Sequence, residues 1–166
     1  MPPGTDPADS GLVVRQSVRV GLDPERAFAL FTTGIAEWWP LDEGYSYGGS
    51  RAKDIVLEPT VGGRFYERFV DGDEIQVGTV VECRPPHRIV FTWRSPEWTA
   101  DTEVEVRFVP RGEGTLVELE HRGFDRLGPE GRAMARRWNG GWPRVIQAYG
   151  TRAAHAAGGG PAPSGG

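Results

Sequence analysis

Two segments of strictly alternating sequence constrain the fold most. Residues 102–109 carry apolar or threonine side chains at the even positions and charged side chains at positions 103, 105 and 107. Residues 115–121 resemble this pattern, with Thr, Val, Leu and His at the odd positions and Leu, Glu and Glu at the even ones. Successive side chains of a strand point to opposite faces, so each segment predicts a strand with one face on a core and one in water. Such a half-buried sheet needs a cover on its apolar face.

Five further segments of similar composition predict a sheet of seven strands. Turn signals rich in Gly, Pro and Asp separate most of them, which is typical of an antiparallel meander. Between the first and second strands, Asp23 and Pro24 form a helix start, with an N-cap followed by proline. We expect a short helix there, one more turn at residues 35–39, and an irregular loop over residues 41–52. The five strands are expected at residues 12–20, 55–58, 64–70, 74–82 and 88–94.

The cover for this sheet is predicted in residues 129–156, where large apolar side chains recur at helical spacing. Pro143 lies inside this segment, and an internal proline removes a backbone hydrogen bond and crowds the preceding turn. We therefore expect a kink or break around residues 139–141. The apolar stripe comprises Met134, Trp138, Gly141 or Trp142, Val145 and Tyr149.

Composition limits the class of protein. The chain has 166 residues, a formal net charge of -4 and one cysteine. It therefore fits one domain, shows no bulk charge that would attract nucleic acid, and cannot form an internal disulfide or a thiolate zinc cluster. We expect a single domain at residues 11–156, with disordered tails at 1–10 and 157–166. No secretory signal or membrane-spanning segment is evident, and a cytoplasmic location is expected.

Seven segments, spread from about residue 13 to residue 149, have a familiar sequence: 24–32 (PERAFALFT), 38–40 (WWP), 58–71 (EPTVGGRFYERFVD), 78–80 (GTV), 85–93 (PPHRIVFTW), 115–124 (TLVELEHRGF) and 141–142 (GW). On these segments the chain resembles the START-like, or SRPBCC, superfamily, which has the helix-grip fold. Within it, the chain is most similar to the branch named for the activator of heat-shock chaperone ATPase (AHSA-like), which neighbours polyketide-cyclase-like proteins.

The resemblance implies an α+β fold, in which a curved antiparallel seven-stranded sheet wraps around a long C-terminal helix, with two short helices after the first strand. It also implies a ligand cavity between sheet and helix. These motifs are mostly turns and core positions, so they indicate the fold more than the function. A chaperone partner is conceivable from the branch name, but no second domain that would dock one is evident.

Aromatic side chains provide the candidate pocket. The chain has six tryptophans; each taken singly is compatible with core packing, whereas the group indicates a pocket, because side chains this large seldom fill a small core without a gap. Only Trp98, in a turn, is predicted to lie apart from the other five. The predicted ligand-binding residues are Trp38, Trp39, Phe65, Glu67, Phe69, Phe91, Trp93, His121, Trp138 and Trp142.

Glu67 and His121 are the candidate catalytic residues. Glu67 shares a strand face with Phe65 and Phe69, so an inward face would place a carboxylate in an apolar cavity with a raised pKa. The alternative is an outward face, or an ion pair with Arg64 or Arg68. His121 lies on the core-facing side of the last strand, where it would exchange a proton with a ligand or simply be hydrogen-bonded in the core.

The remaining reactive residues are given structural interpretations. Cys83 alternates with Ile75, Val77, Thr79 and Val81, so these side chains are expected on one face and Cys83 is predicted to be a small buried hydrophobe. Gly62 and Gly63 form a turn, without a phosphate-binding motif. His87 and His155 complete no metal trio with His121, so no metal or cofactor is expected. A strip of arginines on the last helix is interpreted as a solvated face: Arg132, Arg136, Arg137 and Arg144.

Three functions remain open from the sequence. The first is a domain that binds a small apolar, aromatic or lipid-like molecule, as a monomer or homodimer, without membrane insertion. The second is an enzyme of cyclase, dehydratase or hydrolase type that uses Glu67 and His121 as acid and base. The third is a co-chaperone-like regulatory module, which would have an exposed apolar patch and little internal cavity.

Overall fold

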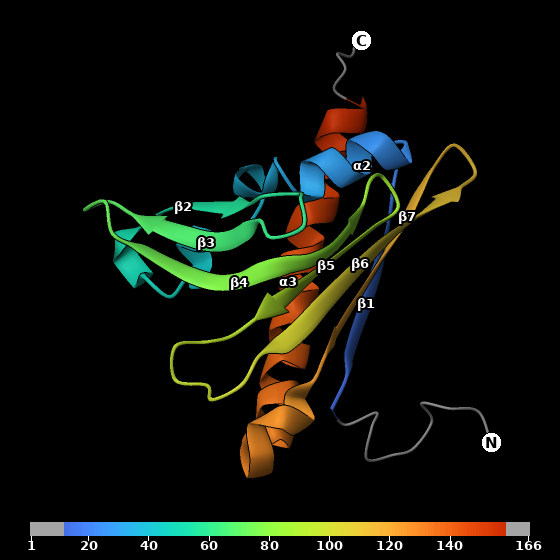
Figure 1. Cartoon of the computed structure of the whole chain (residues 1–166). Helices are drawn as coiled ribbons and strands as arrows, with labels where there is room; N and C mark the ends of the chain where they lie inside the picture. Colours follow the sequence, from blue (N-terminus) through green and yellow to red (C-terminus); the bar gives the residue numbers. More distant parts are fainter. Residues whose placement is uncertain (1–11, 159–166) are drawn as a thin grey trace, which may run out of the picture.

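The protein is a curled antiparallel half-barrel around one long helix (Figure 1). The computed structural model describes residues 12–158. Seven strands pair in the order β1-β7-β6-β5-β4-β3-β2, and α3 crosses the concave side of the sheet. The predicted α+β helix-grip architecture is confirmed.

The strands agree with the predicted ones to within a few residues at each end. They are β1 (Val14–Val20), β2 (Ala52–Leu57), β3 (Arg64–Phe69), β4 (Glu74–Arg84), β5 (Arg88–Trp93), β6 (Thr102–Arg111) and β7 (Gly114–Arg122). The α-helices are α2 (Pro24–Phe31) and α3 (Gly131–Gly158), and short 3-10 turns are η1 (Ile35–Glu37), η2 (Leu41–Glu43), η3 (Gly49–Arg51) and η4 (Phe124–Glu130).

The expected start of α2 is confirmed in atomic detail. Asp23 is the N-cap, and its carboxylate accepts a hydrogen bond of 2.8 Å from the backbone N–H of Arg26. Pro24 occupies the first helical position, where its missing N–H costs nothing. The helix buries Phe28 and Phe31 against Phe108 of β6. Thus α2 closes one end of the half-barrel.

The alternation of β6 and β7 is also confirmed. Their predicted inner side chains are buried, from Thr102 to Phe108 and from Thr115 to His121. Glu105 on the outer face is buried as well, because three arginines surround it. Although burial acts to raise its pKa, hydrogen bonds from Arg88, Arg122 and Arg107 together lower the pKa of Glu105 to about 2.

The predicted face assignment of β4 is wrong beyond Val77. Register shifts occur opposite Phe65 and Tyr66 of β3, and again between Val80 and Glu82. Each bulge adds an unpaired residue and moves the following side chains to the other face. Val80 is therefore buried, whereas Val81, predicted to share a face with Val77, is 42% exposed.

Cys83 is accordingly half-buried rather than buried. Its thiol donates to the backbone oxygen of Pro59 over 3.2 Å. Burial raises the pKa of the Cys83 thiol, so the reactive thiolate is disfavoured. The interpretation as a structural residue therefore agrees with its surroundings.

The predicted break in the last helix is wrong. α3 continues from Gly131 to Gly158 through Pro143 (Figure 1). The carbonyl that loses its partner belongs to Asn139, and both Asn139 and Gly140 are exposed. Water can therefore bond this carbonyl, and the two glycines preceding Trp142 leave room around the proline ring. The helix ends two residues beyond the predicted domain boundary, and the predicted tails otherwise lie outside the described residues.

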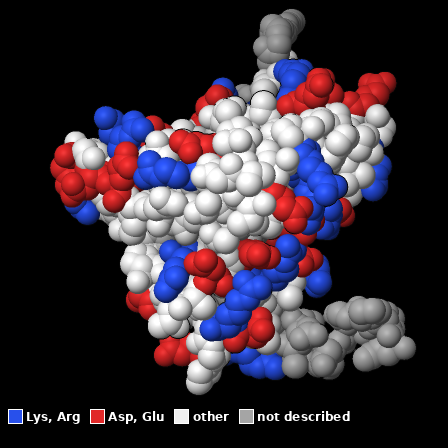
Figure 2. Space-filling model, viewed as in Figure 1, with Lys and Arg blue, Asp and Glu red and all other residues white. Residues whose placement is uncertain are grey.

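The surface shows no dominant charge on the face seen in Figure 2, where acidic and basic side chains are intermixed. Among the described residues, no helix combines the length and the apolar character that crossing a membrane requires.

Candidate functional site

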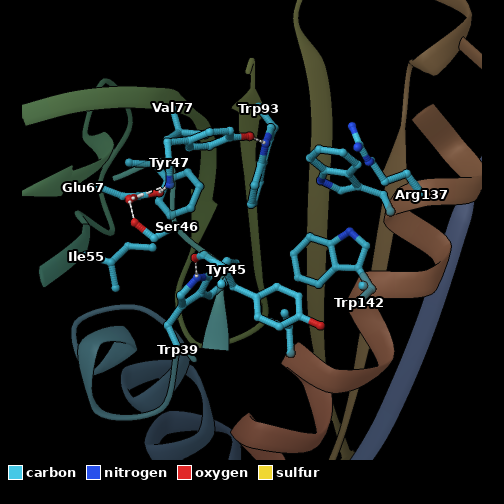
Figure 3. Close-up of a pocket in the computed structure, with 15 residues that line it drawn as sticks. Trp39, Tyr45, Ser46, Tyr47, Ile55, Glu67, Val77, Trp93, Arg137 and Trp142 are labelled. Carbon is cyan, nitrogen blue, oxygen red and sulfur yellow. Dashed lines mark hydrogen bonds between the residues drawn. The ribbon is translucent and has the colours of Figure 1, made fainter. Parts of the chain in front are cut away.

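A cavity of about 300 Å³ lies between the sheet, the loop before η3 and the helix α3 (Figure 3). Strands β2 to β5 form one wall, and the loop at residues 44–47 and one face of α3 form the others. Of its lining residues, Gly44 and Arg137 are exposed, which indicates that the cavity reaches the surface between the loop and the helix. The lining residues are Trp39, Gly44, Tyr45, Ser46, Tyr47, Ile55, Phe65, Glu67, Val77, Trp93, Arg137, Trp138, Gly141, Trp142 and Val145.

Aromatic rings form most of the wall. The ring of Trp93 lies 5.7 Å from Trp142, 6.0 Å from Trp39 and 5.2 Å from Phe65, measured between centroids. Trp39 also meets Trp142 edge to face at 6.0 Å. Tilted and edge-to-face pairs of this kind hold one another in fixed positions. The cavity is therefore bounded by a mutually supported set of rings that presents apolar surface to a ligand.

Glu67 is the acidic residue of the cavity wall. Its side chain is 3% exposed and accepts hydrogen bonds from the Ser46 hydroxyl (2.6 Å) and the backbone N–H of Tyr47 (3.1 Å). Burial raises the pKa of Glu67, while these hydrogen bonds act in the opposite direction. Neither Arg64 nor Arg68 pairs with it; both approach Glu74 instead. Of the two orientations that the sequence left open for Glu67, the structure has the inward one.

The loop over the cavity is held by side chains from three directions. The Trp39 indole N–H donates to the backbone oxygen of Tyr45 over 2.8 Å. The Tyr47 hydroxyl accepts from the indole N–H of Trp93 over 3.0 Å and also pairs with Ser95. At the far end, Arg144 of α3 forms a two-pronged ion pair with Glu43. These contacts fix Tyr45 and Tyr47 beside the cavity.

His121 is fully buried but does not line the cavity. Its Nδ1 accepts from the Trp142 indole N–H over 3.1 Å, and its Nε2 lies 2.7 Å from the Thr102 hydroxyl. Because an indole N–H only donates, Nδ1 carries no proton and Nε2–H donates to Thr102. Burial lowers the pKa of His121 to about 3, so the ring is neutral. The structure therefore does not bring Glu67 and His121 together as an acid and a base around one ligand.

Six of the ten predicted ligand-binding residues line the cavity: Trp39, Phe65, Glu67, Trp93, Trp138 and Trp142. The other four stand behind this layer. Trp38 packs on Phe31 and Tyr149 and donates to the Leu30 oxygen, Phe91 packs behind Phe65, Phe69 lies under Gly48 and Arg51, and His121 supports Trp142.

The sequence predicted that Trp98 lies apart from the other tryptophans, and this prediction is wrong. It is 8% exposed and its ring lies 5.2 Å from that of Trp138 and 6.2 Å from that of Phe124. The turn that carries it folds back toward the start of α3. Trp98 therefore supports the cavity wall from outside.

Sequence reasoning missed three neighbouring residues of the loop, Tyr45, Ser46 and Tyr47. The loop has no periodicity from which the direction of a side chain could be deduced. The density of aromatic and hydroxyl groups in an otherwise Gly-rich stretch was the available signal. Arg137 had been assigned to a solvated strip; it is exposed, but it also lies at the cavity rim.

Within residues 12–158, no three His, Cys, Asp or Glu side chains are grouped so that they could hold a metal ion. The polar chemistry of the cavity therefore comes from Glu67, Arg137, and the hydroxyl and indole groups around them.

Comparisons with solved structures agree with this fold. The chain is 32% identical to Txn09, described as an anthrahydroquino-γ-pyrone synthase, over 84% of this chain and 95% of that one, with a TM-score of 0.54. The Aha1 dimer of Colwellia psychrerythraea matches at 18% identity over 88% and 98%, with a TM-score of 0.64. CalU16 of Micromonospora echinospora matches at 21% over 91% and 76%, with a TM-score of 0.54.

No curated protein matches the sequence significantly. The family described as "Activator of Hsp90 ATPase homolog 1-like protein" matches residues 22–149, which include every residue that lines the cavity and most of α3. The chain therefore belongs to this AHSA-like family within the START-like superfamily.

Proposed function

We propose that the protein binds a small, mostly apolar aromatic molecule in the cavity between sheet, loop and α3. The observation that carries this proposal is the cavity of about 300 Å³ whose walls are mainly tryptophan, tyrosine and phenylalanine rings. Aromatic walls favour flat ring systems, because stacked and edge-to-face contacts bury large areas without polar mismatch. The few polar groups would orient the guest rather than provide most of its affinity.

A pair of glycines in α3 allows a direct test. A Cβ atom at Gly141 would lie 3.5 Å from the Tyr45 ring, beside the cavity, whereas one at Gly140 would meet nothing within 4 Å. Gly141→Leu should therefore fill the cavity, and Gly140→Leu should leave it open. Both changes raise helix propensity equally, so their effects on α3 itself are matched.

The measurement is native mass spectrometry of freshly purified protein, followed by extraction of any bound molecule and rebinding by calorimetry. We expect the wild type and Gly140→Leu to retain the same molecule and Gly141→Leu to lose it. Equal retention by both variants would show that the molecule binds elsewhere. A wild type that neither retains a molecule nor binds aromatic compounds would contradict the proposal.

A second candidate is an enzyme of the cyclase type, and one combination of observations favours it. Txn09, at 32% identity, is described as a synthase, and Glu67 places a carboxyl of raised pKa on the cavity wall. Such a group can take a proton from a bound ligand and return it later in the reaction. Its test is Glu67→Gln, which should abolish turnover of a hydroxylated aromatic precursor while the variant still binds that precursor.

The third function considered, a co-chaperone-like module, receives less support. It predicted an exposed apolar patch and little cavity. The large exposed apolar side chains among the described residues are Val61, Val70 and Val81, which lie on three separate segments. The Colwellia structure is of a dimer, which supports a homodimer as the state to test for this chain. Light scattering coupled to gel filtration would distinguish it from a monomer.

A further inference from the structure

The cavity wall carries two charged side chains, which come from different elements. Among its lining residues, Glu67 and Arg137 carry charged groups, and the others are apolar or neutral. Glu67 comes from β3 and Arg137 from α3, so they stand on opposite walls, with the rings of Tyr47 and Trp93 between them (Figure 3). A guest that fills the cavity would therefore meet an acidic group at one end and a basic group at the other.

Arg137 differs from two other arginines of the same helix. Arg144 is paired with Glu43 and Arg152 with Glu37, and both of these pairs tie α3 to the segments before β2. Arg137 meets no carboxylate within residues 12–158. It stands at the exposed rim, next to the Trp138 ring. Its guanidinium group is therefore available to an anionic group of a ligand that enters the cavity.

Glu67 keeps one acceptor position open toward a ligand. A carboxylate offers about four lone-pair sites. The Ser46 hydroxyl uses one on Oε1, and the Tyr47 N–H is shared between Oε1 (3.1 Å) and Oε2 (3.2 Å). The backbone of Gly48 also donates to this carboxylate. With these three donors counted, Glu67 has capacity for a fourth, and no arginine or lysine of the described chain pairs with it. A ligand hydroxyl is the neutral donor that fits a partly satisfied, buried carboxylate.

We propose that the ligand is a small flat aromatic acid with a hydroxyl group at the end opposite its acid group. The hydroxyl would donate to Glu67, and the acid group would bind Arg137 at the rim. This inference rests on the proposed function, because it assigns the ligand class of the same cavity. The cavity volume of about 300 Å³ lies at the lower limit of ligand pockets, which favours a molecule of one or two fused rings.

Four naphthalene compounds test the arrangement. 6-Hydroxy-2-naphthoate has the two groups at opposite ends, and 3-hydroxy-2-naphthoate has the same groups side by side. 2-Naphthoate and 2-naphthol carry one group each. By titration calorimetry, we expect 6-hydroxy-2-naphthoate to bind most tightly and 3-hydroxy-2-naphthoate to bind no better than the compounds with one group.

Variants then assign each gain to a residue. Arg137→Met should weaken the binding of 6-hydroxy-2-naphthoate and 2-naphthoate by about two- to five-fold, as expected for the loss of an exposed ion pair. It should leave the binding of 2-naphthol unchanged. Arg136→Met is the matched control, because Arg136 is exposed and does not line the cavity. Glu67→Gln should weaken binding of 2-naphthol and 6-hydroxy-2-naphthoate by about ten-fold and leave 2-naphthoate unchanged or tighter.

The outcomes separate this inference from the proposed function. If all four compounds bind equally well, or if Arg137→Met and Arg136→Met behave alike, the ligand class is wrong while a binding cavity still stands. If the wild type binds none of them and retains no molecule on purification, the proposed function itself fails. Because Arg137 is exposed, Arg137→Met should fold even if the buried variant Glu67→Gln is unstable. The ligand affinities of Arg137→Met therefore test the proposed ligand class by themselves.

Discussion

The indole N–H of Trp142 donates to Nδ1 of His121 over 3.1 Å, and this contact joins a cavity wall to the centre of the sheet. The Nε2–H group of His121 donates to the Thr102 hydroxyl, and this hydroxyl in turn donates to the backbone oxygen of Trp93 over 2.7 Å. Two of the tryptophans that line the cavity are thereby positioned by one neutral imidazole. His121 acts on the site through these rings rather than by touching a ligand.

The first prediction concerns pH. The pKa of His121 is about 3 in the folded protein, against about 6.5 in an unfolded chain. Between these values the unfolded chain takes up a proton that the folded chain does not, so acid favours unfolding. The contribution of this group to stability is complete above pH 6.5 and is lost as the pH falls, by up to about 1.4 kcal/mol per pH unit.

Urea denaturation at pH 7.5, 6.0 and 5.0 measures this slope. His121→Asn, which does not titrate, should be less stable at pH 7.5 but show a flatter dependence on pH. Glu105 does not interfere, because its pKa of about 2 makes its contribution fall only below about pH 4.5. Parallel slopes for wild type and variant would remove His121 as the cause.

The second prediction concerns Glu105 on the outer face of the sheet. Its carboxylate lies 2.6 Å from Arg88, 2.7 Å from Arg122 and 3.2 Å from Arg107. Glu105→Gln leaves these partly buried guanidinium groups facing each other without a counter-charge. We expect a loss of about 1–3 kcal/mol, less than for a fully buried pair because the arginines are 28–40% exposed.

The matched control is Glu118→Gln on the same face, whose partner Arg107 lies at 3.4 Å and whose side chain is 37% exposed. Its cost should stay within about 0.5 kcal/mol. Urea denaturation at pH 7.5 compares the two. Equal losses would mean that the cluster around Glu105 adds nothing beyond ordinary surface charge.

The sequence predicted those parts of the fold in which the type of a residue and its local spacing determine whether it is buried or where a helix begins. Alternation in β6 and β7 gave the inner face, and the Asp23–Pro24 pair gave the start of α2. It did not predict the bulges of β4, because a register shift is set by the partner strand and not by the residues that shift. The continuity of α3 through Pro143 was likewise not predicted, because the exposure of Asn139, whose carbonyl loses its helical partner, is a property of the folded chain.

In the candidate site, too, local sequence predicted some features, and tertiary contacts determine the others. An inward direction was predicted for His121 and left open for Glu67, and both side chains are buried. Periodicity does not predict how deep a buried side chain lies. The rings of Trp93 and Trp142 contact His121 and line the cavity in its place, whereas Glu67 lines the cavity itself. Which residues of an irregular loop complete the wall depends on its tertiary hydrogen bonds.

The third prediction uses two glycines with opposite surroundings. A Cβ atom at Gly78, next to the register shift between β3 and β4, would lie 1.7 Å from the backbone oxygen of Thr92, so strands β4 and β5 would have to separate. Gly78→Ala should cost more than about 2 kcal/mol or prevent folding. Gly140→Ala, in an open helical position, should instead stabilise the protein by about 0.5–1 kcal/mol. Thermal unfolding followed by circular dichroism gives both signs, and a neutral Gly78→Ala would contradict the close approach.

The last prediction concerns the loop over the cavity. The Ser46 hydroxyl donates to Glu67 and accepts from the backbone N–H of Gly48 over 2.9 Å. Ser46→Ala removes both bonds and leaves the carboxylate with backbone donors alone, from Tyr47 and Gly48. The pKa of Glu67 should then rise further, because one of the groups that favour its charged form is lost.

Two measurements on Ser46→Ala follow from this geometry. Hydrogen exchange read by mass spectrometry should become faster in the peptide that spans residues 44–48, since local opening now breaks fewer bonds. The Glu67 carboxyl, followed by NMR of labelled glutamate, should titrate at higher pH than in the wild type. Ser50→Ala is the control, because Ser50 is exposed in the neighbouring turn η3 and takes no part in the Glu67 hydrogen bonds. If Ser46→Ala exchanges no faster than Ser50→Ala, then Glu67 does not hold the loop, and the indole of Trp39 and the Arg144–Glu43 pair suffice to keep the cavity closed on that side.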